Sequence, residues 1–241
     1  MYLYFEDVNW GLLRLWGARG GVSVLDVGCG YATTSERLRR LGNRVAGIES
    51  SEEAIAVASS RLDEVIPADL QDLESVARLI GTRRFDSLIF ADVLEHLSEP
   101  GDVLKGYLRF LAPGGTVLVS LPNVGLWSVR LSLLAGRFEY AETGVLDRTH
   151  LRFFTRRTAR RLIEEAGLEI TRRTYNPGIV RPLVPLVKKI MKADESGDPA
   201  AILESRAYRT YLKTIYPIER LAAAAWPGAL AFQMIFEARP R

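Results

Sequence analysis

The stretch from Val24 to Ala32, which reads VLDVGCGYA, constrains the fold more than any other part of this sequence. An apolar run leads to two glycines one residue apart, and a helical pattern opens at Thr33. A strand, a tight glycine turn and a helix N-terminus in this order hold the polar part of nucleotide-like ligands in α/β proteins. Taken alone the turn is weak evidence, because glycine turns also join packed elements that bind nothing.

Two residues in and around this turn indicate which ligand it suits. A dinucleotide-binding turn has a third glycine at the position that Thr33 occupies here. Asp26 stands two residues before Gly28 and would repel a pyrophosphate, whereas it suits a ligand that carries an ammonium and a sulfonium group. The turn therefore favours S-adenosylmethionine over a nicotinamide dinucleotide.

Acidic residues follow several later strand patterns. Arg44 to Glu49 forms a second short strand pattern, and Glu49 lies at the distance from the glycines at which a carboxylate reaches ribose hydroxyls. Asp69 follows a third pattern, where it can accept from an adenine amino group, and Asp92 closes a fourth, apolar pattern typical of buried parallel strands. Together these acids are expected to line one crevice at the carboxyl ends of the strands.

The segments VLDVGCGYA, GIESS, PADL, FDSLIFADVLEHL and LAPGGTVLV, in this order over roughly residues 22–122, resemble class I S-adenosylmethionine-dependent methyltransferases. The resemblance implies an α/β fold with a Rossmann-like seven-stranded, mostly parallel sheet, an antiparallel last strand and helices on both faces. It implies S-adenosyl-L-methionine as cofactor, released as S-adenosyl-L-homocysteine. The candidate cofactor-binding residues are Asp26, Gly28, Gly30, Tyr31, Glu49, Ser50, Asp69, Leu70 and Asp92.

A second block, residues 122–170, carries the resemblance further. Its PNVGLWSVRL and DRTHLRFF segments are similar to a bacterial subgroup found with genes for surface-glycan or lipid-linked sugar synthesis. That similarity implies O-methylation of a small or lipid-linked acceptor, and a sugar hydroxyl is the leading candidate for the methylated group. The block is also similar to proteins associated with methionine biosynthesis, which leaves open a non-catalytic, cofactor-binding partner of a biosynthetic enzyme.

The chain has two histidines, and both lie in these segments. His96 is expected to form a hydrogen bond with the backbone or the cofactor, or else to act as a base. His150 is expected to anchor its loop, or else to act as a base or to orient the acceptor. Asp147 would fix the tautomer of His150 or merely cap a turn. We predict no metal at these three residues, because Asp-x-x-His is common by chance. Arg148 and Arg152 either grip an anionic acceptor or pair with surface acids such as Glu139 and Glu142.

The length of 241 residues fits one domain. We expect an N-terminal helical cap (1–20), a cofactor-binding core (21–175), a helical insertion between the last two strands (176–229) and a final strand (230–241). An insertion of this length is expected to form a lid over the acceptor or a homodimer contact. Its segment from Val184 to Lys192 has three lysines next to apolar residues. Such a segment either rests on an anionic membrane surface or forms a helix that packs its apolar side on the core and exposes the lysines to solvent.

Composition narrows the partners. The net charge of +3 gives no reason to expect nucleic acid, and the Asn/Asp-Pro-Pro-Tyr loop of enzymes that methylate nucleic-acid amino groups is missing after the fourth strand. Cys29 is the single cysteine, consistent with a reducing compartment. The first residues carry neither a basic flank nor a long apolar run. We therefore expect a cytoplasmic protein, with peripheral contact at the inner membrane face left open.

Overall fold

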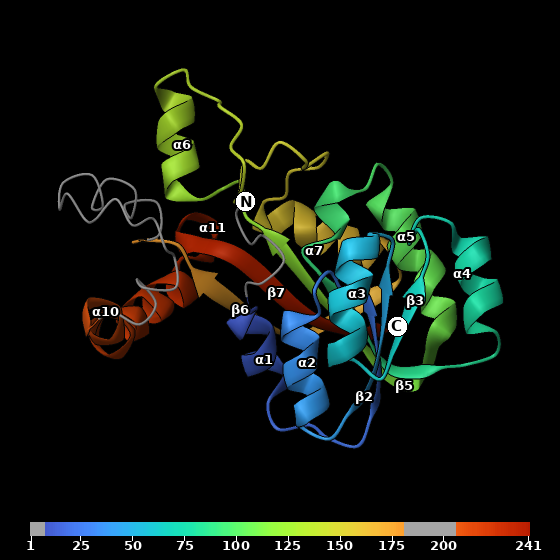
Figure 1. Cartoon of the computed structure of the whole chain (residues 1–241). Helices are drawn as coiled ribbons and strands as arrows, with labels where there is room; N and C mark the ends of the chain where they lie inside the picture. The colour runs from blue at the N-terminus through green and yellow to red at the C-terminus, as the bar shows by residue number, and fades with distance from the viewer. Residues whose placement is uncertain (1–7, 181–205) are drawn as a thin grey trace.

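A computed structural model describes residues 8–180 and 206–241 of the chain (Figure 1). The strands are β1 (Ser23–Val27), β2 (Arg44–Glu49), β3 (Glu64–Pro67), β4 (Phe85–Ala91), β5 (Leu111–Pro122), β6 (Leu168–Pro177) and β7 (Ala231–Pro240). The helices are α1 (Trp10–Trp16), α2 (Thr33–Arg40), α3 (Glu52–Arg61), α4 (Leu73–Ile80), α5 (Pro100–Tyr107), α6 (Trp127–Leu134), α7 (Arg156–Glu165), α10 (Arg206–Ala225) and α11 (Pro227–Leu230), with 3₁₀ turns η2 (Leu94–His96) and η3 (Leu108–Phe110).

The strands form one seven-stranded sheet in the order β3-β2-β1-β4-β5-β7-β6. Strands β1 to β5 pair in parallel, whereas β7 runs antiparallel to both β5 and β6. This arrangement confirms the predicted Rossmann-like sheet with an antiparallel last strand. Because β1, β2, β3 and β4 are parallel, their carboxyl ends lie at one edge of the sheet, where the predicted acids follow them.

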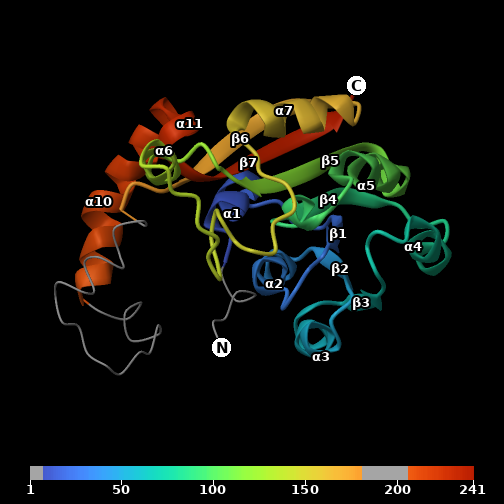
Figure 2. The ribbon, with the colours of Figure 1, turned by 90° about the horizontal axis from the view of Figure 1, so that it is seen from above.

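Helices cover both faces of the sheet (Figure 2). Alternate residues of a strand face opposite sides, and β1 shows this directly: Leu25 belongs to one buried apolar cluster and Val24 to the other. The larger cluster packs α4, α5 and α7 against the sheet, and the smaller one packs α1, α2 and α3 against the opposite face. This sandwich fixes the strand ends on which the candidate site is built.

The N-terminal helix is shorter than the helical cap expected over residues 1–20. Helix α1 begins at Trp10, where the side chain of Asn9 caps it by accepting the N–H of Leu12 at 3.0 Å. Residues 1–7 of the predicted cap lie outside the described residues. The helix packs against β6 and β7 on the face that α2 also covers.

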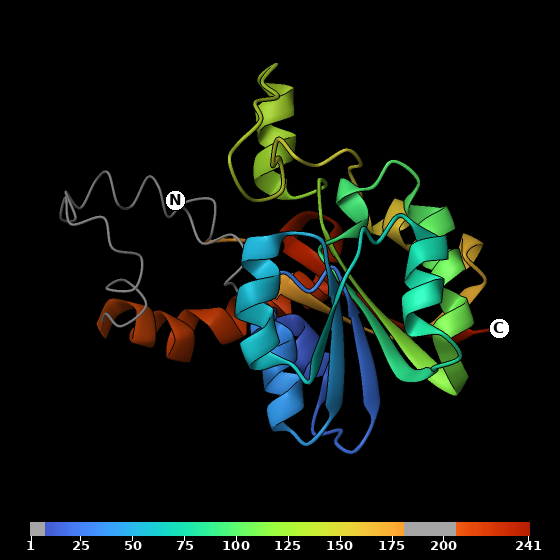
Figure 3. The same ribbon diagram turned by 45° about the vertical axis from the view of Figure 1, so that its right-hand side comes forward.

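Helix α6 differs from its expected packing. The apolar residues over about 124–136 have the spacing of an amphipathic helix packed on a core, but α6 spans Trp127–Leu134 and stands away from the sheet (Figures 1 and 3). Val129 is its only buried residue, whereas Leu133 is half exposed and Leu134 is 84% exposed. The helix is anchored through a small cluster with Leu126 and Val145 rather than through the main core.

The last part of the chain also differs in its boundaries. Strand β6 continues to Pro177, two residues beyond the expected end of the core, and β7 begins at Ala231. Helix α10, with Pro217 inside it, packs along β6, and the Tyr216 hydroxyl accepts from Arg14 of α1 at 3.1 Å. The basic run 184–192 lies outside the described residues. Of the helices that the structure describes, none combines the length and apolar character of a membrane span.

Candidate functional site

The glycine turn after β1 shapes the first part of the site. Gly28 and Gly30 adopt left-handed backbone angles, with φ of 73° and 53°. A Cβ on Gly28 would lie 2.8 Å from a methyl group of Val93, so no side chain fits there without displacing that residue. The turn is tied to β2 by the N–H groups of Gly28 and Cys29, which donate to the Ile48 carbonyl at 2.9 and 3.0 Å. The bare backbone therefore leaves room at the strand end for a ligand.

Glu49, at the end of β2, closes over this turn. One oxygen of its carboxylate accepts the N–H of Gly30 at 2.9 Å, and the other accepts the N–H groups of Ser50 and Ser51 at 2.8 and 2.9 Å. A carboxylate has about four lone-pair directions, so three backbone donors fix its orientation and leave capacity for one more donor. The remaining capacity suits a ribose hydroxyl, as the sequence predicts for Glu49.

Asp26 supplies a buried acid beneath the turn. The Ser35 hydroxyl donates to one of its oxygens at 2.6 Å, while the other oxygen is buried without a hydrogen-bond partner. Burial raises the pKa of this carboxyl from 3.8 to about 6, against the lowering effect of the Ser35 hydrogen bond. An unpartnered buried acceptor is costly unless a donor or cation reaches it, and the ammonium group of S-adenosylmethionine fits that need.

Asp92, directly after β4, is held by three elements. Its carboxylate accepts from Ser120 at 3.0 Å, from Gln233 at 2.5 Å and, more weakly, from Asn9 at 3.4 Å. Its backbone is left-handed, with φ of 57°, which is uncommon outside glycine and turns the chain sharply into η2. This bend delivers the residues after Asp92 to the same edge of the sheet as Asp26 and Glu49.

The other predicted cofactor residues lie at the same strand ends. Asp69 is exposed and accepts the N–H of Gln71 at 2.9 Å, and the Leu70 carbonyl accepts from Tyr107 at 3.0 Å. The Tyr31 hydroxyl donates to Glu53 at 2.5 Å. Ser50 is an exposed residue just past β2, where its N–H donates to Glu49. The structure thus gathers all the predicted residues at one edge, and the set fits a nucleoside with a charged amino-acid tail.

A second group of side chains joins this edge from η2 and the loop after α6. It consists of Glu95, His96 and His150, and one potential ligand atom from each lies within 4.8 Å of the others. Nε2 of His150 lies 4.0 Å from a carboxylate oxygen of Glu95. Both side chains are buried, and neither that nitrogen nor either Glu95 oxygen has a hydrogen-bond partner. Unpartnered polar atoms that face one another inside a protein are rare, so this group requires an explanation.

The two imidazole rings have fixed tautomers. Nδ1 of His150 lies 3.2 Å from the Val145 carbonyl, and Nδ1 of His96 lies 3.3 Å from the Thr149 carbonyl. Since a carbonyl only accepts, both Nδ1 atoms carry the proton and both Nε2 atoms carry a lone pair. Burial lowers the pKa of both histidines, and burial raises the pKa of Glu95 well above its ordinary value. The histidines are therefore neutral at neutral pH.

Asp147 has a different role from the one considered for a catalytic triad. One of its oxygens accepts the N–H and the hydroxyl of Thr149 at 2.8 and 2.6 Å, so the side chain caps the turn that leads to His150. The Val145 carbonyl, rather than Asp147, fixes the tautomer of His150. The turn-capping alternative is correct for this residue.

Two arginines proposed for the acceptor side are bound to surface groups. Arg148 forms an ion pair with Glu142, as the surface-pairing alternative expects. Arg152 donates to the Ser98 carbonyl at 2.9 and 2.6 Å and lies 3.5 Å from the surface acid Glu99, in agreement with the same alternative. Both guanidinium groups already have local partners.

Glu95 is the residue that sequence reasoning passed over. It lies inside the LEHL segment that carries the resemblance, yet no role was assigned to it. The available signal was its context, an acid between Leu94 and Leu97 just past a buried strand, where full burial is unusual for a glutamate. Its meeting with His150 depends on a loop more than fifty residues away, which local patterns do not reveal.

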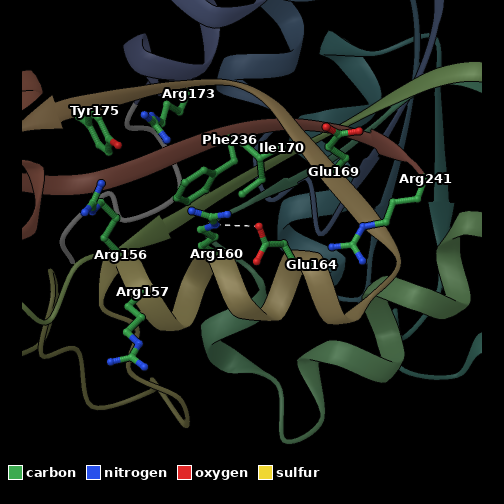
Figure 4. A pocket seen from close by; sticks show the side chains of 10 residues that line it. All are labelled: Arg156, Arg157, Arg160, Glu164, Glu169, Ile170, Arg173, Tyr175, Phe236 and Arg241. Atoms are coloured by element: carbon green, nitrogen blue, oxygen red, sulfur yellow. Dashed lines mark hydrogen bonds and ion pairs between the residues drawn. The ribbon is translucent and has the colours of Figure 1, made fainter.

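A separate hollow of about 530 Å³ lies between α7 and β6 (Figure 4). Arginines dominate its lining, and Arg160 pairs with Glu164 at 2.7 Å. The full lining is Arg156, Arg157, Arg160, Glu164, Glu169, Ile170, Arg173, Tyr175, Phe236 and Arg241. This hollow shares no residue with the cofactor-binding group or with the group of Glu95, His96 and His150. The candidate site is therefore the one at the carboxyl ends of the strands and not this hollow.

Known proteins agree with this arrangement. Residues 4–173 match the family described as "Methyltransferase domain". A ubiquinone biosynthesis O-methyltransferase of Thiobacillus denitrificans is 32% identical over 164 residues, which cover 65% of this chain and 70% of that protein. Among eight relatives of that name, the matched part spans 47% to 70% of their own length.

Solved structures show the same fold. A S-adenosylmethionine-dependent methyltransferase from Archaeoglobus fulgidus superposes with a TM-score of 0.58 at 15% identity, covering 94% of this chain and 90% of that one. A magnesium protoporphyrin IX methyltransferase from Synechocystis PCC 6803 with bound S-adenosylhomocysteine gives 0.56 at 16% identity, covering 95% and 79%.

The fold and the strand-end residues define a Rossmann-like protein that binds a nucleoside cofactor. With the family match over most of its length, this chain belongs to the class I S-adenosylmethionine-dependent methyltransferases.

Proposed function

We propose that the protein transfers the methyl group of S-adenosylmethionine to a hydroxyl oxygen of a small or lipid-linked acceptor. The observation that carries the proposal is the buried, neutral His150, whose unprotonated Nε2 lies at the cofactor edge of the sheet without a hydrogen-bond partner. A hydroxyl is a weak nucleophile until it loses its proton, whereas amines and thiolates need less help. A base at this place therefore favours oxygen as the methylated atom.

Methyl transfer from S-adenosylmethionine requires few catalytic groups of the protein. The cofactor supplies a methyl carbon already activated by its sulfonium leaving group. The protein has to align the acceptor oxygen with that carbon and keep water out. As the new C–O bond forms and the C–S bond breaks, the hydroxyl proton passes to Nε2 of His150 and later to solvent. His96 lies next to this ring, with centroids 4.8 Å apart, and helps to position it.

Two observations bear on the acceptor. The segments around His150 resemble proteins that act in surface-glycan or lipid-linked sugar synthesis, which favours a sugar hydroxyl. A relative that is 32% identical over 164 residues is named ubiquinone biosynthesis O-methyltransferase, which favours a hydroxyl of a ubiquinone precursor. A lipid-linked sugar and a ubiquinone precursor both carry a lipid, and for such an acceptor we propose a cytoplasmic protein that works beside the inner membrane face.

The test is transfer of a deuterated methyl group from labelled S-adenosylmethionine, followed by mass spectrometry. The panel contains a prenylated dihydroxybenzoate, a polyprenyl-linked sugar, free nucleotide sugars and, as a control for nitrogen acceptors, a matched amine. We expect label on oxygen of one lipid-linked acceptor and none on the amine. Tight cofactor binding with no label on any hydroxyl would favour the rival, a non-catalytic partner protein such as the relatives associated with methionine biosynthesis suggest.

A further inference from the structure

We propose that Glu95, His96 and His150 bind a divalent transition-metal ion. The proposal rests on the proposed methyl transfer to a hydroxyl, and it replaces the His150 base by a metal ion as the group that activates this hydroxyl. It starts from the buried side chains of Glu95 and His150 and the half-buried side chain of His96, each with a ligand atom within 4.8 Å of the others. Among the described residues this is the one such cluster.

The second observation is the state of Glu95. Its side chain is fully buried, and both carboxylate oxygens lack hydrogen-bond partners. A buried carboxylate without donors or a counter-charge is costly, and no lysine or arginine pairs with Glu95 among the described ion pairs. A divalent cation between Glu95 and Nε2 of His150 satisfies the carboxylate and the nitrogen at once.

The histidines are already set up as ligands. A metal-bound imidazole commonly donates its other N–H to a carbonyl or carboxylate, which fixes its tautomer and orientation. His150 and His96 do this with the Val145 and Thr149 carbonyls, and Nε2 of His150 faces Glu95. Asp147 then acts one step further out, by holding the turn that carries Thr149.

The ligand types indicate which ions fit. Two imidazole nitrogens and one carboxylate favour zinc, manganese or ferrous iron, whereas magnesium and calcium prefer oxygen ligands. Ligand atoms around a tetrahedral zinc lie about 3.4 Å apart, given bonds of about 2.1 Å. The 4.0 Å between Nε2 of His150 and the Glu95 oxygen therefore has to shorten by about half an ångström, and separations of up to 4.8 Å within the cluster by up to about 1.4 Å. Because η2 and the loop at 145–152 carry the ligands, that shift does not disturb the sheet.

Three protein ligands leave a coordination position open, as in catalytic metal sites. An acceptor hydroxyl bound there would lose its proton more readily, because the cation stabilises the oxyanion. The proton goes to solvent, the oxygen takes the methyl group, and Nε2 of His150 acts as a ligand instead of a base. This reading accounts for Glu95, which a histidine base alone leaves unexplained.

The direct test is metal binding by the untagged, full-length protein after treatment with a chelator. The chain has two histidines, so a proton–carbon NMR spectrum contains two Cε1–H and two Cδ2–H imidazole signals, and those of both residues are expected to shift when zinc chloride is added. Cobalt(II) is expected to give visible absorption bands typical of nitrogen and oxygen ligands. Calorimetry should show one zinc site, and magnesium should compete poorly.

Variants locate the site. Glu95→Gln and His150→Gln are expected to weaken zinc binding at least tenfold, whereas Glu99→Gln, an exposed acid four residues further along, should leave it unchanged. Circular dichroism checks that the buried variants fold. The proposal is overturned if zinc does not shift the histidine signals of the unaltered protein and cobalt(II) gives no such absorption bands, a result that does not depend on whether a variant folds. It is also overturned if all variants bind zinc with the same affinity as the unaltered protein.

The metal proposal and the proposed function fail separately. Methyl transfer to a hydroxyl that survives a chelator, with Glu95→Gln as active as the unaltered protein, would remove the metal and keep the function. Zinc bound at the three residues without methylation of any hydroxyl would remove the function and keep the metal site.

Discussion

The carboxylate of Glu49 accepts the backbone N–H of Gly30 at 2.9 Å, so the acid at the end of β2 and the glycine turn after β1 form one unit. The same carboxylate also accepts two N–H groups at the start of α3. Its orientation is therefore set before a ligand arrives, which lowers the ordering cost of binding.

Replacing Glu49 with alanine is expected to weaken binding of S-adenosylhomocysteine by about 1.5–3 kcal/mol, the usual scale for a hydrogen bond to a charged group. Isothermal titration calorimetry measures the change, with Glu52→Ala, an exposed acid in the first turn of α3, as the matched control. Equal affinity in Glu49→Ala and the unaltered protein would remove Glu49 from the cofactor site.

Asp26 predicts a pH dependence. Burial raises the pKa of its carboxyl to about 6, so the side chain carries its charge above that pH and loses it below. An ammonium group is attracted by the charged form, and cofactor affinity is therefore expected to fall as the pH drops through about 6. Asp26→Asn should bind weakly at every pH, with that dependence gone. Affinity that rises on acidification would contradict this role.

The raised pKa of Asp26 affects the stability of the ligand-free protein in the opposite direction: lower pH weakens cofactor binding but increases this residue's contribution to the free energy of unfolding. Because the pKa is higher in the folded than in the unfolded state, the folded state holds the Asp26 proton more tightly. This contribution is present in full below the ordinary pKa of 3.8 and is lost as the pH rises to about 6. Urea unfolding of the unaltered protein and Asp26→Asn across this window measures it: the difference between them should shrink toward low pH.

His150 is expected to control the rate of methyl transfer and leave cofactor affinity alone. If Nε2 of His150 is the base rather than a metal ligand, His150→Ala should lower kcat by about 10²- to 10⁴-fold, the usual contribution of a positioned base. Since burial lowers the pKa of His150, the rate should fall only below the ordinary histidine value of 6.5. His96→Ala should affect cofactor binding more than rate. Equal turnover in His150→Ala would reduce His150 to a loop anchor.

Gly47 of β2 offers a test of the packing beneath the turn. A Cβ at this position would lie 2.5 Å from the sulfur of Cys29 and 2.8 Å from a methyl group of Leu62. Gly47→Ala should therefore cost about 1–3 kcal/mol of stability through overpacking. Adding Cys29→Ala removes the sulfur and is expected to recover part of that loss in urea unfolding. Additive effects of the two substitutions would show that they do not touch.

The basic run of the insertion keeps its prediction from sequence. If Lys188, Lys189 and Lys192 rest on an anionic membrane, each contributes about 1 kcal/mol, and changing all three to Glu should abolish salt-sensitive binding to anionic vesicles. Co-sedimentation with vesicles decides this, with neutral vesicles as the control. Identical sedimentation of the triple variant would leave the lid and homodimer alternatives for the insertion.

The sequence predicts the part of this protein that is built from local patterns. The turn at Gly28 and the acids at the ends of the first four strands follow from periodicity and from short motifs, whereas the arrangement of the seven strands in the sheet is implied by the family resemblance. Tertiary contacts decide the rest. Glu95 is buried only because the loop that carries His150 packs against it. Helix α6 has an apolar pattern but few neighbouring residues to pack against, so Leu134 is exposed.

Asn9 has a consequence for the order in which the protein folds during synthesis. Its side chain donates to Ser120 at 2.9 Å and accepts from Asn176 at 3.2 Å, and Asn176 in turn donates to Gln233, which holds Asp92. A ribosome that makes the chain from its N-terminus delivers Gln233 more than two hundred residues after Asn9. Strands β1 to β4 can pair early, but the edge that binds the cofactor is complete only when β7 has been made, so a nascent chain is expected to remain unable to hold its cofactor until that point.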